Sequence, residues 1–221
     1  MELVSVATAR VVWLLDITDL NPRGKSIFPE ILEWLEEEYH FEKAPKSATD
    51  LDESKALVFS RGTFQAGEEI FVDVELKIFS DGFVASTWSS TRNTEAFLES
   101  VLRSATEEFS LAYTPGILRR KMYLSELNLR SQKELIGINP KLSQIAEKMS
   151  ALLPQNIRLP FEIAGLTVSP IQGTSNISIG PFRFERKLNT SPDEHKFYST
   201  APLQTDDHLR FLEWFEEEFM A

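Results

Sequence analysis

The stretch ALVFSRGTFQAGEEIFVDVELKIFSDGFVASTW, residues 56–88, decides the fold of this chain. Runs rich in β-branched and aromatic residues predict three strands, at 56–64, 68–79 and 82–88. A glycine-containing turn separates the first two strands, and Asp81-Gly82, a strong signal for a tight hairpin, separates the last two. Because these connections are too short for a crossover helix, the three strands must run antiparallel.

The segments on either side complete the first half of the chain. An apolar, β-branched run predicts a buried strand at 11–17. Apolar residues at helical spacing predict amphipathic helices at 28–39 and 94–109, and Pro29 suits the first turn of the earlier helix. The first half is therefore predicted as strand, helix, three strands and helix.

The second half repeats this order. Its predicted strands lie at 121–129, 161–169, 177–188 and 196–200. Its predicted helices lie at 140–153 and 205–219, with Asn139 and Thr205 as N-caps.

The two halves also align with each other residue by residue. Trp13 corresponds to Tyr123, and Asp16 to Glu126, both at an offset of 110 positions. We infer an internal duplication. The predicted fold class is α+β: two β-α-β-β-β-α repeats, an acidic one at 1–112 and a near-neutral one at 113–221. Each is expected to have an antiparallel sheet covered on one face by helices, and the two to form one compact unit with a pseudo-twofold arrangement.

The amino-acid composition limits which structures and sites this chain can form. Hydrophobic residues make up 42% of the chain, and 16 Phe with 4 Trp suffice for a sizeable core. The absence of cysteine excludes disulfides, thiol catalysis and cysteine-based zinc sites. The N-terminal stretch lacks the basic start and continuous apolar run of a signal peptide, and no run has the roughly 18 apolar residues of a membrane span. A cytoplasmic location is expected.

The charge is unevenly placed. The net charge is −11, and residues 1–110 carry 10 Lys and Arg against 21 Asp and Glu, whereas residues 111–221 carry 13 of each. A negative field repels phosphate backbones and anionic lipid headgroups, so nucleic-acid and membrane partners are not expected. The charge favours a basic protein partner or serves solubility alone.

Two similar phrases, LEWLEEEYHF at 32–41 and LEWFEEEFMA at 212–221, each place three glutamates at the carbonyl end of a helix. That end favours cations, by about 0.3–1 kcal/mol per exposed charge. Either the glutamates are solvated at small cost, or basic groups face them from a partner or from this chain. The hypothesised partner-binding residues are Glu36, Glu37, Glu38, Glu216, Glu217 and Glu218. The basic candidates inside the chain are Arg119, Arg120, Lys121, Arg183, Arg186 and Lys187.

No motif for catalysis or for a cofactor survives inspection. The sequence GKS at 24–26 lies between a predicted strand and helix, but Asp19 replaces the upstream glycine of a phosphate-binding loop and Pro22 removes a backbone donor. The cluster at 206–208, Asp-Asp-His, has metal-ligand chemistry without ligand spacing, and its acids suit the first turn of a helix. The sequence therefore predicts no cofactor, no metal and no identifiable catalytic residue.

Three functional hypotheses remain. The leading one is a non-enzymatic protein-interaction or assembly module. The alternative is a small-molecule sensor with a pocket at the junction of the repeats, lined by aromatic residues. The third is a hydrolase with an acidic site at Asp16 and Glu126. The hypothesised ligand-binding residues are Trp13, Trp88, Tyr123, Tyr198, Asp16 and Glu126.

Overall fold

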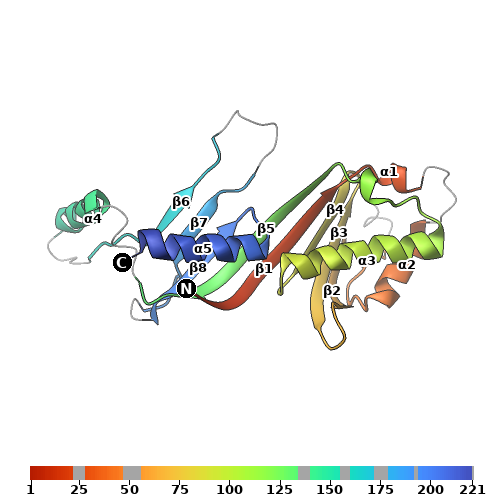
Figure 1. The fold of residues 1–221 in the computed structure, drawn as a ribbon, viewed down its shortest axis with the longest axis horizontal. Coiled ribbons are helices and arrows are strands. Elements are labelled where there is room, and N and C mark those ends of the chain that lie inside the picture. Colours follow the sequence, from red (N-terminus) through yellow and green to blue (C-terminus); the bar gives the residue numbers. More distant parts are fainter. Residues whose placement is uncertain are drawn as a thin grey trace. The chain divides into compact units, whose positions relative to one another are not determined.

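The computed structural model describes residues 1–21, 28–46, 56–133, 140–154, 160–171, 179–191 and 194–220. Its strands are β1 (Glu2–Leu14), β2 (Leu57–Gln65), β3 (Phe71–Phe79), β4 (Gly82–Thr87), β5 (Arg120–Arg130), β6 (Gly165–Val168), β7 (Phe182–Arg186) and β8 (Lys196–Ala201). Its helices are α1 (Ile17–Leu20), α2 (Phe28–Glu38), α3 (Thr91–Phe109), α4 (Pro140–Leu152) and α5 (Thr205–Phe219), with a 3₁₀ turn η1 (Pro115–Ile117) (Figure 1).

The strands of the described ranges join one antiparallel sheet in the order β2-β3-β4-β1-β5-β8-β7-β6. Together with the helices, this sheet confirms the predicted α+β class. The hairpin between β3 and β4 pairs Phe79 with Gly82. Gly82 has a φ of 152°, and a Cβ atom there would lie 2.1 Å from the carbonyl oxygen of Trp13. Gly82 is the first residue of β4, after the turn at Ser80 and Asp81, and only glycine fits at that position.

The chain divides into two compact units. Unit 1 comprises residues 1–5, 126–202 and 206–221, and unit 2 comprises residues 6–125 and 203–205. The division of the chain into repeats at 112/113 stays a prediction.

The core of unit 2 lies between its strands and the helices α2 and α3. Strand β3 alternates between buried and more exposed positions, as a half-buried strand must. Its buried side chains are Val72, Val74, Leu76 and Ile78. Tyr39, which follows α2, meets Phe97 of α3 edge to face, with ring centroids 5.1 Å apart. Helix α3 runs along the strands of this unit (Figure 1), and its buried stripe includes Leu98 and Val101.

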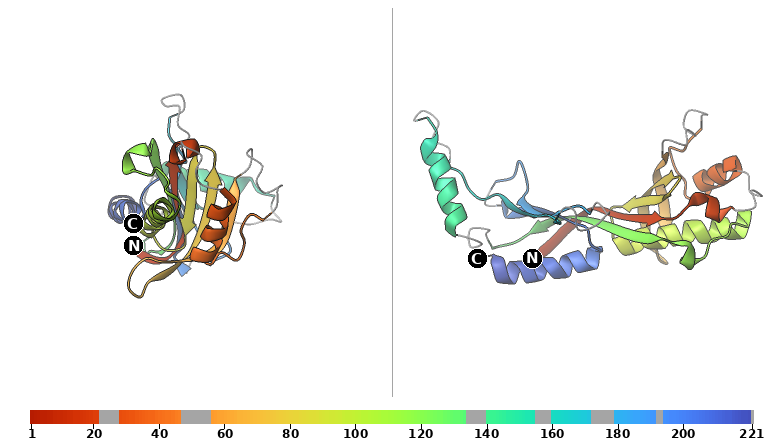
Figure 2. Two further views of the ribbon diagram at one scale, coloured as in Figure 1. Left: turned by 90° about the vertical axis from the view of Figure 1, so that its right-hand side faces the viewer. Right: turned by 90° about the horizontal axis from the view of Figure 1, so that it is seen from above.

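The core of unit 1 lies under α5. Phe184 of β7 and Phe197 of β8 stack with ring centroids 4.9 Å apart, and Phe215 of α5 packs 5.1 Å from Phe184. Leu212 completes the buried stripe of the helix. The last turns of α5 lie beside the start of the chain (Figure 2), and the amine of Met1 donates to the Glu216 carboxylate.

Several boundaries differ from the predicted ones. Strand β1 begins at Glu2 instead of residue 11, and it ends at Leu14 because Asp16 already caps α1. Helix α3 begins at Thr91 instead of Thr94, because Ser90 is its N-cap: the Ser90 hydroxyl accepts a hydrogen bond from the backbone of Asn93. The predicted N-cap Asn139 and the GKS sequence lie outside the described residues.

Candidate functional site

A polar pocket of about 330 Å³ lies at the end of α2 in unit 2. Its lining comes from the end of α2, from β2 and β3, and from α3. The lining residues are Glu38, Tyr39, His40, Thr63, Phe64, Gln65, Phe71 and Ser100. The volume falls within the roughly 300–1,000 Å³ usual for ligand sites. The lining carries one carboxylate and neither lysine nor arginine.

The local sequence builds this pocket through the end of α2. His40 has a φ of 52°, the left-handed conformation that usually takes glycine after a helix. The His40 amide donates to the Glu37 carbonyl at 3.4 Å, and the Phe41 amide donates to the Glu36 carbonyl at 3.0 Å. These two bonds are the Schellman pattern of a helix end. They turn the chain sharply, so that the Tyr39 carbonyl accepts the Thr63 amide at 2.8 Å.

Tyr39 is a buried residue of the pocket wall whose side chain is held by a hydrogen bond. Its hydroxyl lies 3.1 Å from the Ser100 hydroxyl. Burial raises the pKa of Tyr39 above its ordinary value of 10.0, although hydrogen bonds with Ser100 and Ser104 work in the opposite direction. At neutral pH the phenol is therefore uncharged, and it can donate or accept hydrogen bonds but cannot act as a base.

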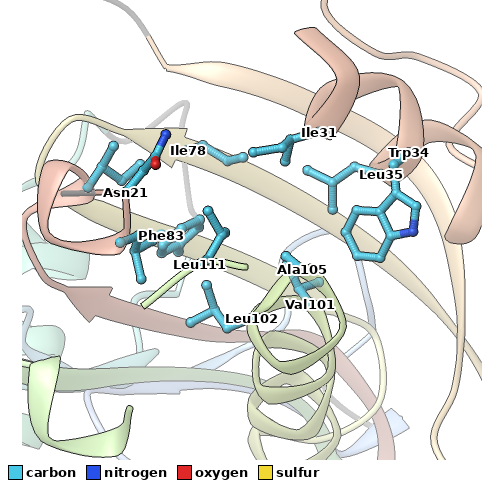
Figure 3. Close-up of a pocket in the computed structure, with 12 residues that line it drawn as sticks. Asn21, Ile31, Trp34, Leu35, Ile78, Phe83, Val101, Leu102, Ala105 and Leu111 are labelled. Atoms are coloured by element: carbon cyan, nitrogen blue, oxygen red, sulfur yellow. The ribbon is translucent and has the colours of Figure 1, made fainter. Parts of the chain in front are cut away.

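A second, apolar pocket lies in unit 2 between α1, α2, α3 and the sheet (Figure 3). Its lining residues are Ile17, Leu20, Asn21, Ile31, Trp34, Leu35, Ile78, Phe83, Val101, Leu102, Ala105 and Leu111. Asn21 is the single polar residue among them. The volume is about 80 Å³. That space exceeds one water molecule but is well below that of ordinary ligand sites. We interpret it as a packing void of the helical layer.

Two of the hypothesised ligand-binding residues in unit 2, Trp13 and Tyr123, have contacts within the chain. Trp13 is fully buried in the core, and Lys121 Nζ lies 4.5 Å above its ring. The Tyr123 hydroxyl donates to Glu95 at 3.2 Å. Trp88, after β4, is exposed.

Asp16 is the N-cap of α1. Its carboxylate accepts hydrogen bonds from the Thr18 hydroxyl at 2.7 Å and the Thr18 amide at 3.0 Å, and Arg119 lies 3.8 Å away. The Thr18 hydrogen bonds hold the pKa of Asp16 below its ordinary value, and the charge of Arg119 adds to this. A carboxylate that stays ionised in this way is poorly suited to the role of general acid.

Glu126 and Tyr198 form a pair in unit 1. Burial, followed by the charge of Glu126 and a hydrogen bond to it, raises the pKa of Tyr198 to about 12. Tyr198 is thus held neutral and donates a hydrogen bond to the Glu126 side chain. This pair is a fixed polar contact on the sheet.

The glutamate clusters meet different basic groups from those expected. Glu36 pairs with Lys46 at 2.7 Å. Glu216 accepts hydrogen bonds from the Met1 amine and the Ser131 hydroxyl, and the Glu216 carbonyl accepts one from Lys133 at 3.1 Å. The exposed members of the two clusters are Glu37, Glu38, Glu217 and Glu218.

Four of the six basic candidates inside the chain have other contacts. Arg119 lies near Asp16 and Asp19, Lys121 pairs with Glu95, Arg186 pairs with Glu162, and Lys187 donates to Asn128. The side chains of Arg120 and Arg183 are exposed.

His208 belongs to the interior of unit 1. Its Nε2 atom lies 2.8 Å from the Ser199 hydroxyl, which donates its proton to the Arg183 carbonyl at 2.8 Å. Because a serine has one proton to give, His208 Nε2 must be the donor of the first bond. Within the described part of the chain, no three His, Asp or Glu side chains gather in a way that could hold a metal ion.

Helix α4 in unit 1 presents large apolar side chains to solvent. Ile145, Met149 and Leu152 are 57%, 44% and 80% exposed, whereas Ala146 is buried. The helix was expected to cover the sheet with its apolar face. The spacing i, i+4, i+7 places the three exposed side chains on one side of the helix. This stripe could not be recognised from the sequence, because periodicity shows that a helix has an apolar face but not what covers that face.

No protein-family model matches this chain, and no curated protein matches it in sequence. Among the described residues, no helix is both long and apolar enough to cross a lipid bilayer.

Proposed function

We propose that this protein is a non-enzymatic protein-interaction or assembly module. The proposal rests on the apolar stripe of α4. This stripe consists of Ile145, Met149 and Leu152, and all three side chains are exposed to solvent. Burying an exposed side chain of this size contributes about 1.5–3 kcal/mol before the cost of ordering it. Three such anchors at helical spacing are the pattern by which an amphipathic helix enters an apolar groove of a partner.

The stripe is tested by site-specific cross-linking. A photo-reactive amino acid replaces Ile145, and the protein is irradiated in the cells that produce it. We expect a cross-linked partner of one discrete mass, and Met149→Ser is expected to abolish that product. Glu147→Ser is the matched control, because Glu147 is exposed on the other side of α4. A product that persists in Met149→Ser, or cross-links only within this chain, would contradict the proposal.

We also propose that the fold arose by duplication with a pseudo-twofold arrangement. The sheet order supports this, because β2-β3-β4-β1 and β6-β7-β8-β5 are the same sequence of strands counted from opposite edges. A second support is the exchange of hydrogen bonds between Thr91 and Thr205, the first residues of α3 and α5. Expression of residues 1–112 and 113–221 as separate chains tests the proposal: two related units should recover structure when mixed, as judged by circular dichroism.

The small-molecule sensor remains the second candidate, and the polar pocket beside Tyr39 favours it. Native mass spectrometry of protein purified from its own cells separates the two functions, because a sensor retains a bound small molecule of defined mass. The hydrolase with an acidic site at Asp16 and Glu126 stays a third hypothesis, supported only by the acidic sequence.

A further inference from the structure

Helix α5 exposes aromatic rings next to carboxylates. Trp214 is 48% and Phe219 is 40% exposed, and their ring centroids lie 5.3 Å apart. Glu217 and Glu218 are also exposed, three and four residues after Trp214, where helical neighbours lie side by side. We call Trp214, Glu217, Glu218 and Phe219 the aromatic–acidic strip.

The corresponding phrase in α2 shows that this exposure is not forced by the sequence. Trp34 packs edge to face against Phe109 at 5.6 Å and against Tyr39 at 6.1 Å. It is partly buried against the core of unit 2. In α5 the corresponding Trp214 has aromatic neighbours on its own helix, Phe211 at 5.5 Å and Phe219 at 5.3 Å. These contacts leave the Trp214 side chain 48% exposed.

The exposed charges of the strip itself are negative, whereas the cations at this helix end, the Met1 amine and Lys133, are bound to Glu216. Glu216 points inward to the Met1 amine and Ser131, so the two following glutamates are the outward charges of this helix end. Both lie in the last turn of α5, where the helix dipole adds a partial negative charge and where the helix itself has no basic residue. The nearby Arg210 is paired with Asp207.

We propose that the aromatic–acidic strip binds an arginine-bearing segment of a partner protein, an inference that rests on the proposed interaction function. A guanidinium group is planar, stacks on an indole face and forms paired hydrogen bonds with carboxylates. The strip offers both features within one helical turn. Anionic lipids and nucleic acids are repelled by the glutamates, and a second copy of the strip would set like charges against each other.

The test uses the whole protein labelled with ¹⁵N and a defined probe, a capped peptide of alternating arginine and leucine. The matched probe replaces each arginine with citrulline, which keeps the shape and removes the charge. We expect the arginine peptide to shift the Trp214 indole signal saturably, and the citrulline peptide to bind at least about tenfold more weakly. Added salt should weaken binding of the arginine peptide, because exposed charges are screened beyond about 8–10 Å at physiological ionic strength.

Two variants locate the site. Glu217→Lys with Glu218→Lys is expected to weaken binding at least about tenfold. Its control is Glu107→Lys with Glu108→Lys, which makes the same charge change at two exposed glutamates near the end of α3. Trp214→Ala should likewise weaken binding.

Trp88→Ala is the control for the tryptophan change, because Trp88 is 51% exposed elsewhere in the chain. Equal effects of the site and control variants, equal binding of both peptides, or no saturable Trp214 shift would each overturn the proposal. Self-association that Trp214→Ala removes would identify the occupant as a second copy instead. None of these results bears on α4, because the cross-linking experiment at Ile145 tests the interaction function separately.

Discussion

Thr91 and Thr205 exchange hydrogen bonds. The Thr91 amide donates to the Thr205 hydroxyl at 3.0 Å, and the Thr205 amide donates to the Thr91 hydroxyl at 2.8 Å. Both residues are buried, and both are the first residue of a helix, where backbone amides lack partners inside the helix. Thr205 was predicted as the cap of its own helix, whereas its hydroxyl satisfies an amide of the other helix.

Replacing either threonine by valine should therefore destabilise the protein. Thr91→Val and Thr205→Val keep the side-chain shape but leave one buried amide without an acceptor, which costs about 1–3 kcal/mol. The control is Thr106→Val, since the Thr106 hydroxyl donates to a carbonyl of its own helix and is partly exposed. Urea unfolding gives the free energy of unfolding of all three variants. A Thr91→Val cost no larger than that of Thr106→Val would contradict the prediction.

The turn at Gly82 gives a second prediction. Gly82→Ala should cost at least about 2–3 kcal/mol, because its φ of 152° is a glycine conformation and the added Cβ would meet the Trp13 carbonyl. Gly116→Ala is the matched control, since a Cβ atom there would have nothing within 4 Å. Thermal unfolding of both variants would decide the matter, and similar melting temperatures would refute the strain argument.

Much of this fold could be predicted from local sequence chemistry. The hairpin between β3 and β4 was predictable because Asp-Gly is a strong hairpin signal, and the antiparallel pairing of β2, β3 and β4 followed from short connections. The start of β1 was not predictable, since residues 2–10 lack a continuous apolar run and yet belong to the strand. Tertiary context overrides local preference there.

The candidate surfaces were harder to predict than the fold. Trp214 and Ile145 belong to amphipathic patterns that predict an inward face, yet both are exposed. Exposure depends on which side of the helix the rest of the chain reaches, and a single sequence does not contain that information. The exposed glutamates Glu217 and Glu218 were singled out by their position at the carbonyl end of α5, because helix electrostatics can be evaluated locally.

His40→Gly is expected to stabilise the protein. His40 has a φ of 52° after α2, a conformation in which a Cβ atom is strained and glycine is not. The expected gain is about 0.5–1 kcal/mol. Glu37→Gly, inside the same helix, should instead destabilise the protein by about the propensity cost of glycine, near 1 kcal/mol. Urea unfolding should give opposite signs for the two glycine variants, and matching signs would count against this account of the helix end.

The Tyr198 phenol should lose its proton at a higher pH than an ordinary tyrosine. Its pKa is raised to about 12 by burial and by Glu126, against an ordinary value of 10.0. Because the folded state holds this proton more tightly than the unfolded state, the associated stability is present below pH 10 and is lost as the pH rises toward 12. The pKa values of Tyr39 and Tyr113 are also raised, so phenolate absorbance should show a late component that becomes smaller in Tyr198→Phe and moves partly to lower pH in Glu126→Gln. An unchanged titration in Glu126→Gln would show that the carboxylate has no part in the shift.

Substitutions of Glu216 and Glu217 should affect stability differently, although the two residues are neighbours in the same glutamate triplet. Burial alone would raise the pKa of Glu216, but hydrogen bonds from the Met1 amine and Ser131 outweigh it and lower the pKa below 4.5. A carboxyl group that is more acidic in the folded state contributes stability above its unfolded pKa, and that stability is lost as the pH falls through the folded value. Glu216→Gln should therefore lower stability at pH 7 and flatten its decline below about pH 4.5, whereas Glu217→Gln, at an exposed position, should change neither. Urea unfolding across this pH range distinguishes the two variants, and parallel curves would mean that the inward glutamate is no more engaged than the outward one.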